Sequence, residues 1–354
     1  MSKNADVYAA LIQKGVQAGR ALAPECYRDA AFFELERERV LALGWHAIAR
    51  WDELPEPGDY KSIHLSGEPL VVVRDEARAL RVFSRICRHR AHPIVEGSGN
   101  TKRFVCPYHR WAYGLDGALV GAPLMKDEAG FDADACSLPE LPTEAWAGFV
   151  MTTLNPTPKP LAPQLAELDK HLLPHGLAEM VDVGVLEFDS PWNWKVMVEN
   201  FMESYHHIGP HADGLAKTNL ARETYPVDAK GPFALLENPG NEGNPDFYVA
   251  QVFPTTLIAL FRGVSIGNWY EMHIDRYDHI TLRVHLLAEA GMFKTPEQVE
   301  GLRAAVMKVH LEDIPVCEAV QAGLQSRLWE PGMLSSYEGT LAKFHRWLGE
   351  AIAG

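Results

Sequence analysis

Residues 87–89 of the chain read Cys-Arg-His, and residues 106–109 read Cys-Pro-Tyr-His. Each segment brings one thiol and one imidazole within two or three positions of each other, so the four donors alternate as Cys, His, Cys, His. Between them, residues 97–100 (Gly-Ser-Gly-Asn) predict a turn, and residues 102–105 predict a short strand that delivers the second segment. The two segments therefore form a pair of loops suited to one metal centre.

Four donors of this kind predict an iron–sulfur cluster. In a Rieske [2Fe-2S] cluster, two cysteines hold one iron and two histidines hold the other, which raises the reduction potential above that of an all-cysteine cluster. The alternative is a structural zinc site with the same atoms around one tetrahedral metal, although zinc fingers usually pair Cys with Cys and then His with His. The predicted cluster ligands are Cys87, His89, Cys106 and His109.

A second metal motif lies at residues 199–211, which read Glu-Asn-Phe-Met-Glu-Ser-Tyr-His-His-Ile-Gly-Pro-His. The pattern predicts a helix over residues 194–207, with Glu203 and His206 one turn apart on the same face. A glycine and a proline then end this helix, so that His211 can reach a metal bound by His206. Fe(II) in oxygenases is commonly held by two histidines and one carboxylate, with the opposite face open. The motif supplies the two histidines, and the carboxylate must come from elsewhere.

The sequence around both motifs resembles one family. Residues 106–123 (CPYHRWAYGLDGALVGAP) look like the second cluster loop of Rieske non-haem iron oxygenases, and residues 200–211 fit that family's second metal motif. The chain is similar to the terminal oxygenase (alpha) subunits of the aromatic-ring-hydroxylating dioxygenase superfamily. The resemblance implies an α+β fold, with a β-rich Rieske [2Fe-2S] domain and a helix-grip catalytic domain, in which an antiparallel sheet surrounds a long helix. One position departs, because the family commonly has glycine where this chain has Arg110.

The resemblance also implies the third iron ligand. It identifies residues 309–318 as the family's downstream helical segment and places Asp313 as a ligand of a mononuclear Fe(II), with Glu312 as the nearest competitor. Asn200 and Tyr205 match family positions near the iron, where an amide and a phenol can orient ligands or gate access. The alternative for these two is that they are ordinary polar residues on a half-buried helix.

Glu203 matches the family's carboxylate that links the two metal centres across a subunit boundary. In the family, subunits assemble head to tail, as a homotrimer or a multiple of it, because cluster and iron in one subunit lie too far apart for useful electron transfer. A metal-bound histidine favours a hydrogen bond from its other ring nitrogen, and one carboxylate can satisfy two such histidines. Many ring-hydroxylating members have aspartate here, and glutamate is more similar to branches that oxidise substituents, including quaternary-ammonium demethylases.

Composition indicates a two-domain enzyme of the cytoplasm. The 354 residues are 47% apolar and 23% charged, without a twenty-residue apolar run or a signal peptide, so we expect no membrane association. The cluster accounts for two of only five cysteines, which favours a reducing compartment. A net charge of −14 argues against nucleic acid as a partner. No glycine-rich dinucleotide fingerprint is present, so a separate ferredoxin or NAD(P)H-dependent reductase must bring the electrons.

The charge is unevenly distributed. Residues 74–110 carry nine lysines or arginines against three acids, a net charge of +6, whereas the remainder of the chain carries −20. One interpretation is a docking surface for an acidic electron carrier such as a ferredoxin, because opposite potentials speed encounter. The other is that these arginines pair with acids of a neighbouring subunit. The sequence does not separate the two.

We expect the Rieske domain at residues 45–155, and the catalytic domain at residues 1–44 and 156–354. Short β-like runs fill the first, and a proline-rich linker follows it. In the second, antiparallel strands are predicted at residues 247–253, 257–261, 269–274 and 279–288, and helices at residues 296–311, 316–328 and 340–352.

The expected activity is use of O2 and two external electrons to hydroxylate an aromatic or ring-containing substrate, as in the catabolism of aromatic hydrocarbons. The alternative is N- or O-demethylation of a quaternary-ammonium (betaine- or carnitine-like) or methoxy substrate. Six strand aromatics bear on this choice, because they can stack on a planar ring, enclose a cation, or simply pack in the core: Phe247, Tyr248, Phe253, Phe261, Trp269 and Tyr270. A simple electron carrier and a zinc-binding scaffold are the competing classes, and iron and sulfide analysis distinguishes them.

Overall fold

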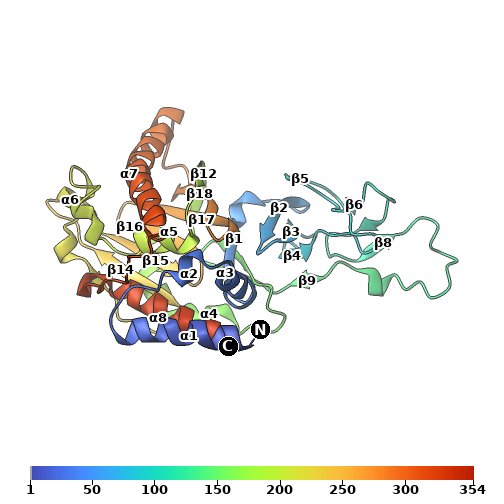
Figure 1. The fold of residues 1–354 in the computed structure, drawn as a ribbon. Helices are drawn as coiled ribbons and strands as arrows, with labels where there is room; N and C mark the ends of the chain where they lie inside the picture. The colour runs from blue at the N-terminus through green and yellow to red at the C-terminus, as the bar shows by residue number, and fades with distance from the viewer. Residues whose placement is uncertain (1) are drawn as a thin grey trace. The chain divides into compact units, whose positions relative to one another are not determined.

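The computed structural model describes residues 2–354, and the chain forms two compact units. One is Ala47–Lys159, and the other combines the residues up to His46 with Pro160–Gly354 (Figure 1). None of the helices among the described residues is both long enough and apolar enough to cross a membrane.

The unit Ala47–Lys159 is built from short antiparallel strands, which confirms the β-rich domain expected from the sequence. Its strands form three sheets, with the orders β1-β11-β10, β5-β2-β3-β4-β9 and β6-β7-β8. The strands are β1 (His46–Arg50), β2 (Asp59–Leu65), β3 (Glu68–Arg74), β4 (Leu80–Ser84), β5 (Ser98–Asn100), β6 (Phe104–Val105), β7 (Ala112–Tyr113), β8 (Leu119–Gly121), β9 (Glu140–Leu141), β10 (Thr143–Trp146) and β11 (Phe149–Thr152). Fully buried Val71, Val73 and Phe83 pack with the two loop cysteines, so one core supports both loops.

The second unit is organised around a seven-stranded antiparallel sheet with the order β12-β18-β17-β16-β15-β14-β13. The strands are β12 (Met180–Ser190), β13 (Tyr225–Pro226), β14 (Phe233–Asn238), β15 (Phe247–Val252), β16 (Thr256–Phe261), β17 (Ile266–Arg276) and β18 (His279–Glu289). The four strands expected from alternating apolar residues are all present. The strands β12, β13 and β14 were not predicted. In β12, a bulge between Asp182 and Gly184 shifts the register against β18 and interrupts the alternation of apolar residues.

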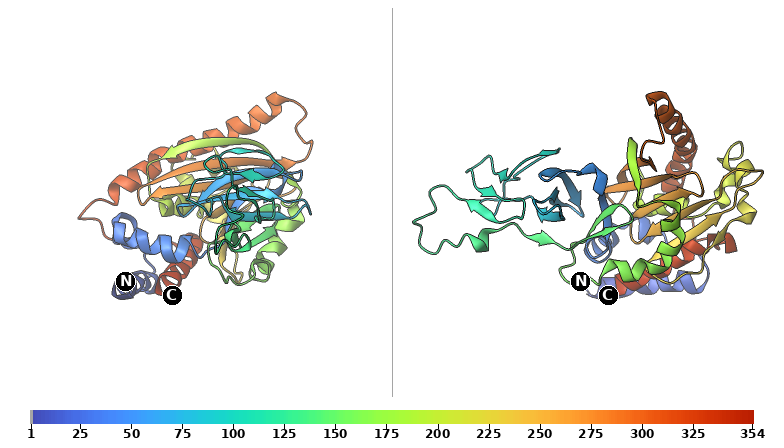
Figure 2. Two further views of the ribbon diagram at one scale, coloured as in Figure 1. Left: turned by 90° about the vertical axis from the view of Figure 1, so that its right-hand side faces the viewer. Right: turned by 180° about the vertical axis from the view of Figure 1, so that it is seen from behind.

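Helices cover the sheet, as a helix-grip domain requires. They are α1 (Ser2–Gln17), α2 (Glu25–Arg28), α3 (Ala30–Glu36), α4 (Leu161–Leu172), α5 (Trp194–Phe201), α6 (Leu215–Thr218), α7 (Pro296–Gly323) and α8 (Gly339–Ala353). The shared core joins α5 and α7 to the sheet, and α1 and α8 lie side by side in each view (Figures 1 and 2).

The helix α7 differs from the prediction. Two helices separated near Pro315 were expected, but one helix runs through this proline from Pro296 to Gly323. A proline inside a helix removes one backbone hydrogen bond, and buried contacts on both sides can outweigh that loss. Here His310 before the proline and Cys317 after it are both buried.

A buried ion pair connects the N-terminal segment to the iron-motif helix. Lys195 Nζ of α5 lies 2.7 Å from Glu36 Oε1 of α3, and both side chains are fully buried. The ammonium also lies 5.4 Å from the centroid of the Phe32 ring and 5.0 Å from that of Trp194. Removing one partner of such a pair typically costs roughly 3–5 kcal/mol, since the other is left as an uncompensated buried charge. The segment before the β-rich unit is therefore an integral part of the catalytic unit.

Candidate iron and cluster sites

The helix α5 presents the second metal motif. Asn193 caps it, since its Oδ1 accepts a hydrogen bond from the backbone N–H of Lys195 at 2.9 Å. The predicted extent to residue 207 was wrong: α5 ends at Phe201, and a 3-10 turn, Tyr205–Ile208, follows. The Glu203 carboxylate accepts the backbone N–H of His206 at 3.0 Å, which supplies this N–H with a partner outside an α-helix. Glu203 and His206 are nevertheless adjacent, as expected.

The structure brings His206, His211 and Asp313 together. One donor atom from each lies within 4.8 Å of the others. Nε2 of His211 is 3.0 Å from Asp313 Oδ1, and Nε2 of His206 is 3.7 Å from the same oxygen. Two imidazoles and one carboxylate converging on one point are the donor set of mononuclear non-haem Fe(II) sites, with the remaining positions open.

Two further carboxylates orient the histidines. Glu203 Oε1 lies 2.6 Å from Nδ1 of His206, and Glu312 Oε2 lies 2.7 Å from Nδ1 of His211. Both imidazoles therefore present Nε2 to the common point, which is the arrangement that metal-bound histidines require. Asn200 Nδ2 donates to Asp313 Oδ1 at 3.4 Å. The residues present thus fit a bound iron.

The role of Glu312 was missed in the sequence, where it was only a competitor of Asp313. Successive residues of a helix point in directions about 100° apart. The two acids of α7 consequently approach His211 from different sides, one at each ring nitrogen. The available signal was the carboxylate pair itself, since a metal histidine usually has a carboxylate or carbonyl partner.

Electrostatics keep Asp313 ionised. Burial raises its pKa, but hydrogen bonding and charge attraction from His211 outweigh burial, and the pKa of Asp313 lies below its usual range. His207 is buried as well, and desolvation lowers its pKa to about 3, so it is a neutral neighbour. Tyr205 is 47% exposed and is not among the residues lining the cavity described next, whereas Asn200 is.

A cavity of about 300 Å³ opens onto the three converging side chains. Its walls are mostly apolar and come from α5, α7 and the strands β15, β16 and β17. Of the six aromatic residues singled out in the sequence, three line it: Phe247, Phe261 and Tyr270. Phe201 of α5 is a fourth, which strand periodicity could not indicate.

The other three aromatic residues face elsewhere. The guanidinium of Arg262 lies over the ring of Tyr248, 5.3 Å from its centroid. The ring of Trp269 stacks on that of His285 with a centroid distance of 4.2 Å, and the ring of Phe253 lies 5.8 Å from that of Phe344. For Tyr248 and Trp269 the reason is strand alternation, since their neighbours Phe247 and Tyr270 face the cavity.

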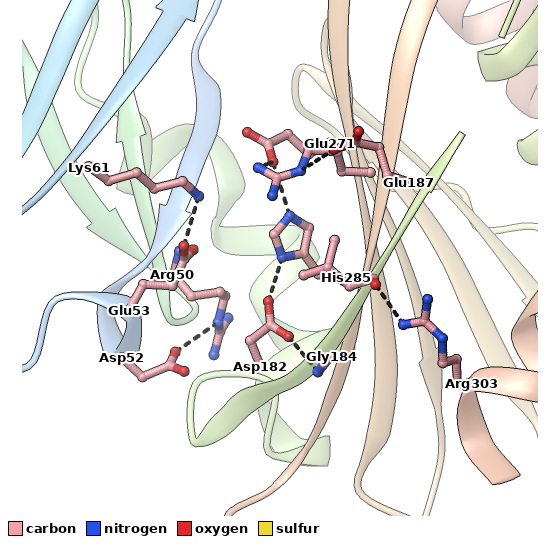
Figure 3. Close-up of polar contacts among 12 residues, drawn as sticks. Arg50, Asp52, Glu53, Lys61, Asp182, Gly184, Glu187, Glu271, His285 and Arg303 are labelled. Carbon is pink, nitrogen blue, oxygen red and sulfur yellow. Dashed lines mark hydrogen bonds and ion pairs between the residues drawn. The ribbon is translucent and has the colours of Figure 1, made fainter. Parts of the chain in front are cut away.

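Glu271, an acid on the same strand as Tyr270, also faces away from the cavity. It follows Tyr270 on β17 and lies 3.0 Å from Nε2 of His285, whose Nδ1 lies 2.5 Å from Asp182 (Figure 3). Burial lowers the pKa of His285, but its hydrogen bonds to the two acids prevail, and the net shift is upward. Arg283 adds an ion pair to Glu271 at 3.5 Å. This acid is therefore engaged within a charged network on the opposite face of the sheet.

The two cluster loops have the same backbone design. In the first, Cys87 N–H donates to His92 O at 2.9 Å and Ala91 N–H donates to Cys87 O at 3.1 Å. The second repeats both bonds, from Cys106 to Trp111 at 2.8 Å and from Arg110 to Cys106 at 3.0 Å.

The fifth residue of each loop has a positive φ. The values are 52° for Ala91 and 61° for Arg110. A left-handed backbone is what glycine adopts without strain. The geometry thus explains why the family commonly has glycine at the position of Arg110.

The four predicted cluster ligands lie close together in pairs, with the two histidine rings adjacent and both cysteines in one buried core. The rings of His89 and His109 are 4.5 Å apart, and Cys87 and Cys106 are 3% and 1% exposed. Nδ1 of His89 is buried without a hydrogen-bond partner among the described residues, as a metal-ligating nitrogen would be. The hydroxyl of Tyr113 lies 3.3 Å from Cys87 Sγ. These residues fit a Rieske cluster.

Four of the nine cations in residues 74–110 are used within the unit. Arg81 pairs with Glu140 at 2.7 Å, and Arg85 pairs with Glu96. Arg74 and Arg78 donate to backbone carbonyls. The remaining five are exposed around the cluster loops: Arg88, Arg90, Lys102, Arg103 and Arg110.

Two family models match the chain. Residues 44–142 match the Rieske [2Fe-2S] domain, and residues 177–354 match the catalytic domain of the ring hydroxylating alpha subunit. Together they cover both sites described above.

Individual relatives oxidise quaternary ammonium compounds. The carnitine monooxygenase oxygenase subunit of Escherichia coli (strain K12) is 36% identical over 317 residues, which are 85% of this chain and 83% of that protein. The chloroplastic choline monooxygenase of Spinacia oleracea is 28% identical over 341 residues, 92% of this chain and 77% of that protein. A solved quaternary ammonium Rieske monooxygenase, whose structure bears on carnitine oxidation by gut microbiota and on inter-subunit electron transfer, has a TM-score of 0.86 at 25% identity, covering 94% of this chain and 95% of that one.

Proposed function

The chain belongs to the alpha subunits of the Rieske oxygenases, and on that premise we propose that it oxidises a carbon atom beside the cationic nitrogen of a small quaternary ammonium compound. As a member of this family it is a terminal oxygenase that has a Rieske [2Fe-2S] cluster and a mononuclear iron. The observation that carries the substrate proposal is the aromatic wall of the cavity next to the iron motif.

The proposed ligands are those of the two motifs: Cys87, His89, Cys106 and His109 for the cluster, and His206, His211 and Asp313 for the iron. When bound, the cluster stores an electron and the iron activates O2. Glu203 and Glu312 hold the Nδ1 protons of the two iron histidines. Asn200 restrains the Asp313 carboxylate from the side of α5.

The cavity suits a cation that cannot donate hydrogen bonds. A quaternary nitrogen carries no N–H, so its attraction comes from ring faces, at about 0.5–2 kcal/mol per ring. Two pairs of aromatic rings line the cavity. The ring centroids of Phe247 and Phe261 are 5.3 Å apart, and those of Phe201 and Tyr270 are 4.7 Å apart. The named activities of the relatives and the glutamate at position 203 support the same class.

The proposed reaction replaces one C–H bond beside nitrogen with a C–O bond. One atom of O2 enters the substrate, and the other leaves as water with two electrons from the partner and two protons. The carbinol then loses its C–N bond, which yields an aldehyde, a neutral tertiary amine and one proton. When the oxidised carbon is a methyl group, the aldehyde is formaldehyde.

Ring hydroxylation is the second candidate. A planar aromatic substrate would stack on the same ring faces. Its products retain all carbon–nitrogen bonds, so the two candidates differ in whether a free amine is released. The relatives favour the first candidate over the aromatic substrate expected from the sequence.

We further propose that the protein works as a head-to-tail homotrimer or a multiple of it, with electrons from a ferredoxin or an NAD(P)H-dependent reductase. Glu203 would connect the iron histidine His206 to a cluster histidine of the next subunit. The five exposed cations around the cluster loops are suited to an acidic carrier, because opposite charges speed association.

A single-turnover experiment tests the substrate class without a known reductase. The protein is reduced anaerobically with dithionite, the excess is removed, and O2 is added with either choline or an aromatic acid such as benzoate. We expect an amine and an aldehyde from choline and no oxidation of benzoate. The Asp313→Ala variant is the control, since it keeps a reducible cluster. Hydroxylated benzoate without oxidation of choline would support ring hydroxylation instead.

A further inference from the structure

The cavity beside the iron motif contains no positive side chain. Among the described residues that line it, none is a lysine or an arginine, and the only acids are Glu203 and Asp313. Both acids are occupied, Glu203 by His206 and Asp313 by His211. The walls available to a substrate are therefore electrically neutral.

Cations on the neighbouring elements are directed elsewhere. Arg303 of α7 donates to the backbone carbonyl of Val185 at 2.8 Å. Lys217 of α6 pairs with Asp213 at 2.9 Å. Lys308 of α7 is exposed and is not among the lining residues. A negative group inside the cavity would find none of these as a counter-charge.

Among the described residues, three neutral polar side chains line the cavity with a buried unpaired atom. One is His207, which lies beside the two iron-motif histidines; the other two, Asn268 and His310, lie on the sheet and on α7. Asn268 of β17 is 4% exposed, and its Oδ1 is buried with no hydrogen-bond partner in the part of the chain that the structure describes. His310 of α7, one helical turn before Asp313, is 3% exposed, and its Nε2 is likewise buried and has no partner within residues 2–354. Buried polar groups are normally hydrogen-bonded, so each such atom calls for an explanation.

We propose that Asn268 and His310 recognise an uncharged hydrogen-bonding group, such as a hydroxyl or an amide, at the end of the substrate remote from the ammonium. This inference rests on the proposed function and narrows its substrate class. The substrate is then a monocation of the choline type, and a carboxylate-ended zwitterion such as carnitine or glycine betaine is rejected.

The physical reason is the difference in the cost of burying neutral and charged polar groups in a mostly apolar cavity. A hydroxyl can donate to the carboxamide oxygen of Asn268 or to an unprotonated imidazole nitrogen of His310, which replaces the hydrogen bonds it loses from water. A carboxylate can only accept, and none of the described lining residues is a lysine or an arginine. Its counter-charge would have to come from the iron, whose charge the Asp313 carboxylate already partly offsets. The relative with the higher identity is a carnitine monooxygenase, so this cavity predicts a different preference from that of its sequence relative.

Three compounds of similar size test the proposal on the wild-type protein. They are choline, with a hydroxyl; glycine betaine, with a carboxylate; and propyltrimethylammonium, with an apolar end. The three compete in one mixture during single turnover, and their loss is followed by mass spectrometry, so that the ratios report relative kcat/KM. We expect choline to exceed each of the others by about tenfold or more, since one or two hydrogen bonds separate them.

Variants connect the preference to the named residues. Asn268→Leu should lower the ratio of choline to propyltrimethylammonium about fivefold to tenfold by removing the partner of the hydroxyl. Val249→Ala is the matched control, because it changes the volume of the same wall without removing a hydrogen-bonding group. Asn268→Leu should also raise the Tm or leave it unchanged, since an unpaired buried carboxamide does not stabilise the fold.

The outcomes separate this inference from the proposed function. Oxidation of all three compounds with glycine betaine preferred would overturn the inference and leave the proposed function intact. Oxidation of none of them would overturn both. A preference for choline that persists undiminished in Asn268→Leu and in His310→Leu would show that other residues recognise the hydroxyl.

Discussion

Glu312 and His211 are joined by a 2.7 Å contact between a carboxylate oxygen and Nδ1, although 101 positions separate them in the chain. The next residue of α7, Asp313, faces the other nitrogen of the same ring at 3.0 Å. Two consecutive acids therefore have different tasks. Glu312 contacts the nitrogen that faces away from the common point, and Asp313, the proposed ligand, lies beside the nitrogen that faces it.

Replacing Asp313 should weaken iron binding more than replacing Glu312. Asp313→Ala removes one of three donors, and we expect loss of mononuclear iron and of turnover. Glu312→Gln should weaken iron binding by about 10–100-fold and keep the site loadable, because only the orientation of His211 is disturbed. Iron is titrated against a chelator, with the visible cluster spectrum as the internal standard. Iron retention by Asp313→Ala, with loss in Glu312→Ala, would exchange the two roles.

The cluster ligands can be tested by colour. Cys87→Ser and His109→Ala each remove a donor from an iron of the cluster, so we expect the brown colour and the acid-labile sulfide to disappear while the mononuclear site stays loadable. Cys136→Ser is the control, because this half-buried cysteine lies in the same unit outside both loops. A colourless wild-type protein containing zinc after anaerobic preparation would contradict the assignment.

Glu203→Gln should separate metal binding from electron delivery. Both carboxylate oxygens accept hydrogen bonds from His206, one from the ring and one from the backbone. An amide accepts through its oxygen and places a donor where the second acceptor was. We expect both metals to remain and the cluster to be reoxidised at least tenfold more slowly in single turnover with substrate. Glu223→Gln is a control of the same chemistry, and equal rates in the two variants would show that Glu203 does not mediate the transfer.

Arg110→Gly should stabilise the unit Ala47–Lys159. The left-handed backbone at Arg110, with a φ of 61°, costs a residue with a side chain about 1 kcal/mol relative to glycine. Arg88, in the first cluster loop, does not have a positive φ, so Arg88→Gly should be neutral or destabilising. Thermal denaturation, monitored at the visible absorbance of the cluster, measures the difference. A lower Tm for Arg110→Gly would mean that its side chain contributes more than the strain costs.

The free energy of unfolding should fall, through His285, as the pH rises above about 6.5. Its pKa in the folded protein is raised, despite burial, by hydrogen bonds to Asp182 and Glu271. Protonated His285 therefore stabilises the folded state. This stabilisation is fully present below the pKa of about 6.5 in the unfolded chain, and it is lost as the pH rises through the higher pKa of the folded protein. His285→Gln should flatten this part of the curve of unfolding free energy against pH. His279→Gln is the comparison, since its partner Asp189 is exposed.

Short-range patterns predicted the parts of the sites that are close in sequence. Cys87 with His89, and Cys106 with His109, share loops of a few residues, so spacing alone indicates a common centre. The strands β15 to β18 follow from alternation. The long helix α7 was divided in two, because the effect of Pro315 on a helix is local, whereas the burial of His310 and Cys317 that maintains it is tertiary.

Partners distant in sequence could not be derived in this way. Asp313 was named only from the resemblance. The contact of Glu312 with His211 depends on how α7 packs against the loop that contains His211, which no local pattern of the sequence indicates. Two polar residues of the cavity lining were also missed. Asn268 and His310 lie on a strand and a helix that no motif connects, and their unpaired atoms are a property of three-dimensional packing.

The ion pair between Glu36 and Lys195 has a consequence for synthesis on the ribosome. The two residues are 159 positions apart, and the self-contained unit Ala47–Lys159 lies between them. At about 5–20 residues per second, translation separates their emergence by on the order of ten seconds. During this interval the unit Ala47–Lys159 can fold. The Glu36 carboxylate and the phenylalanines of α3 do not yet have the partners against which they are buried in the folded protein. We therefore expect chaperones to bind the nascent chain mainly within its first 46 residues.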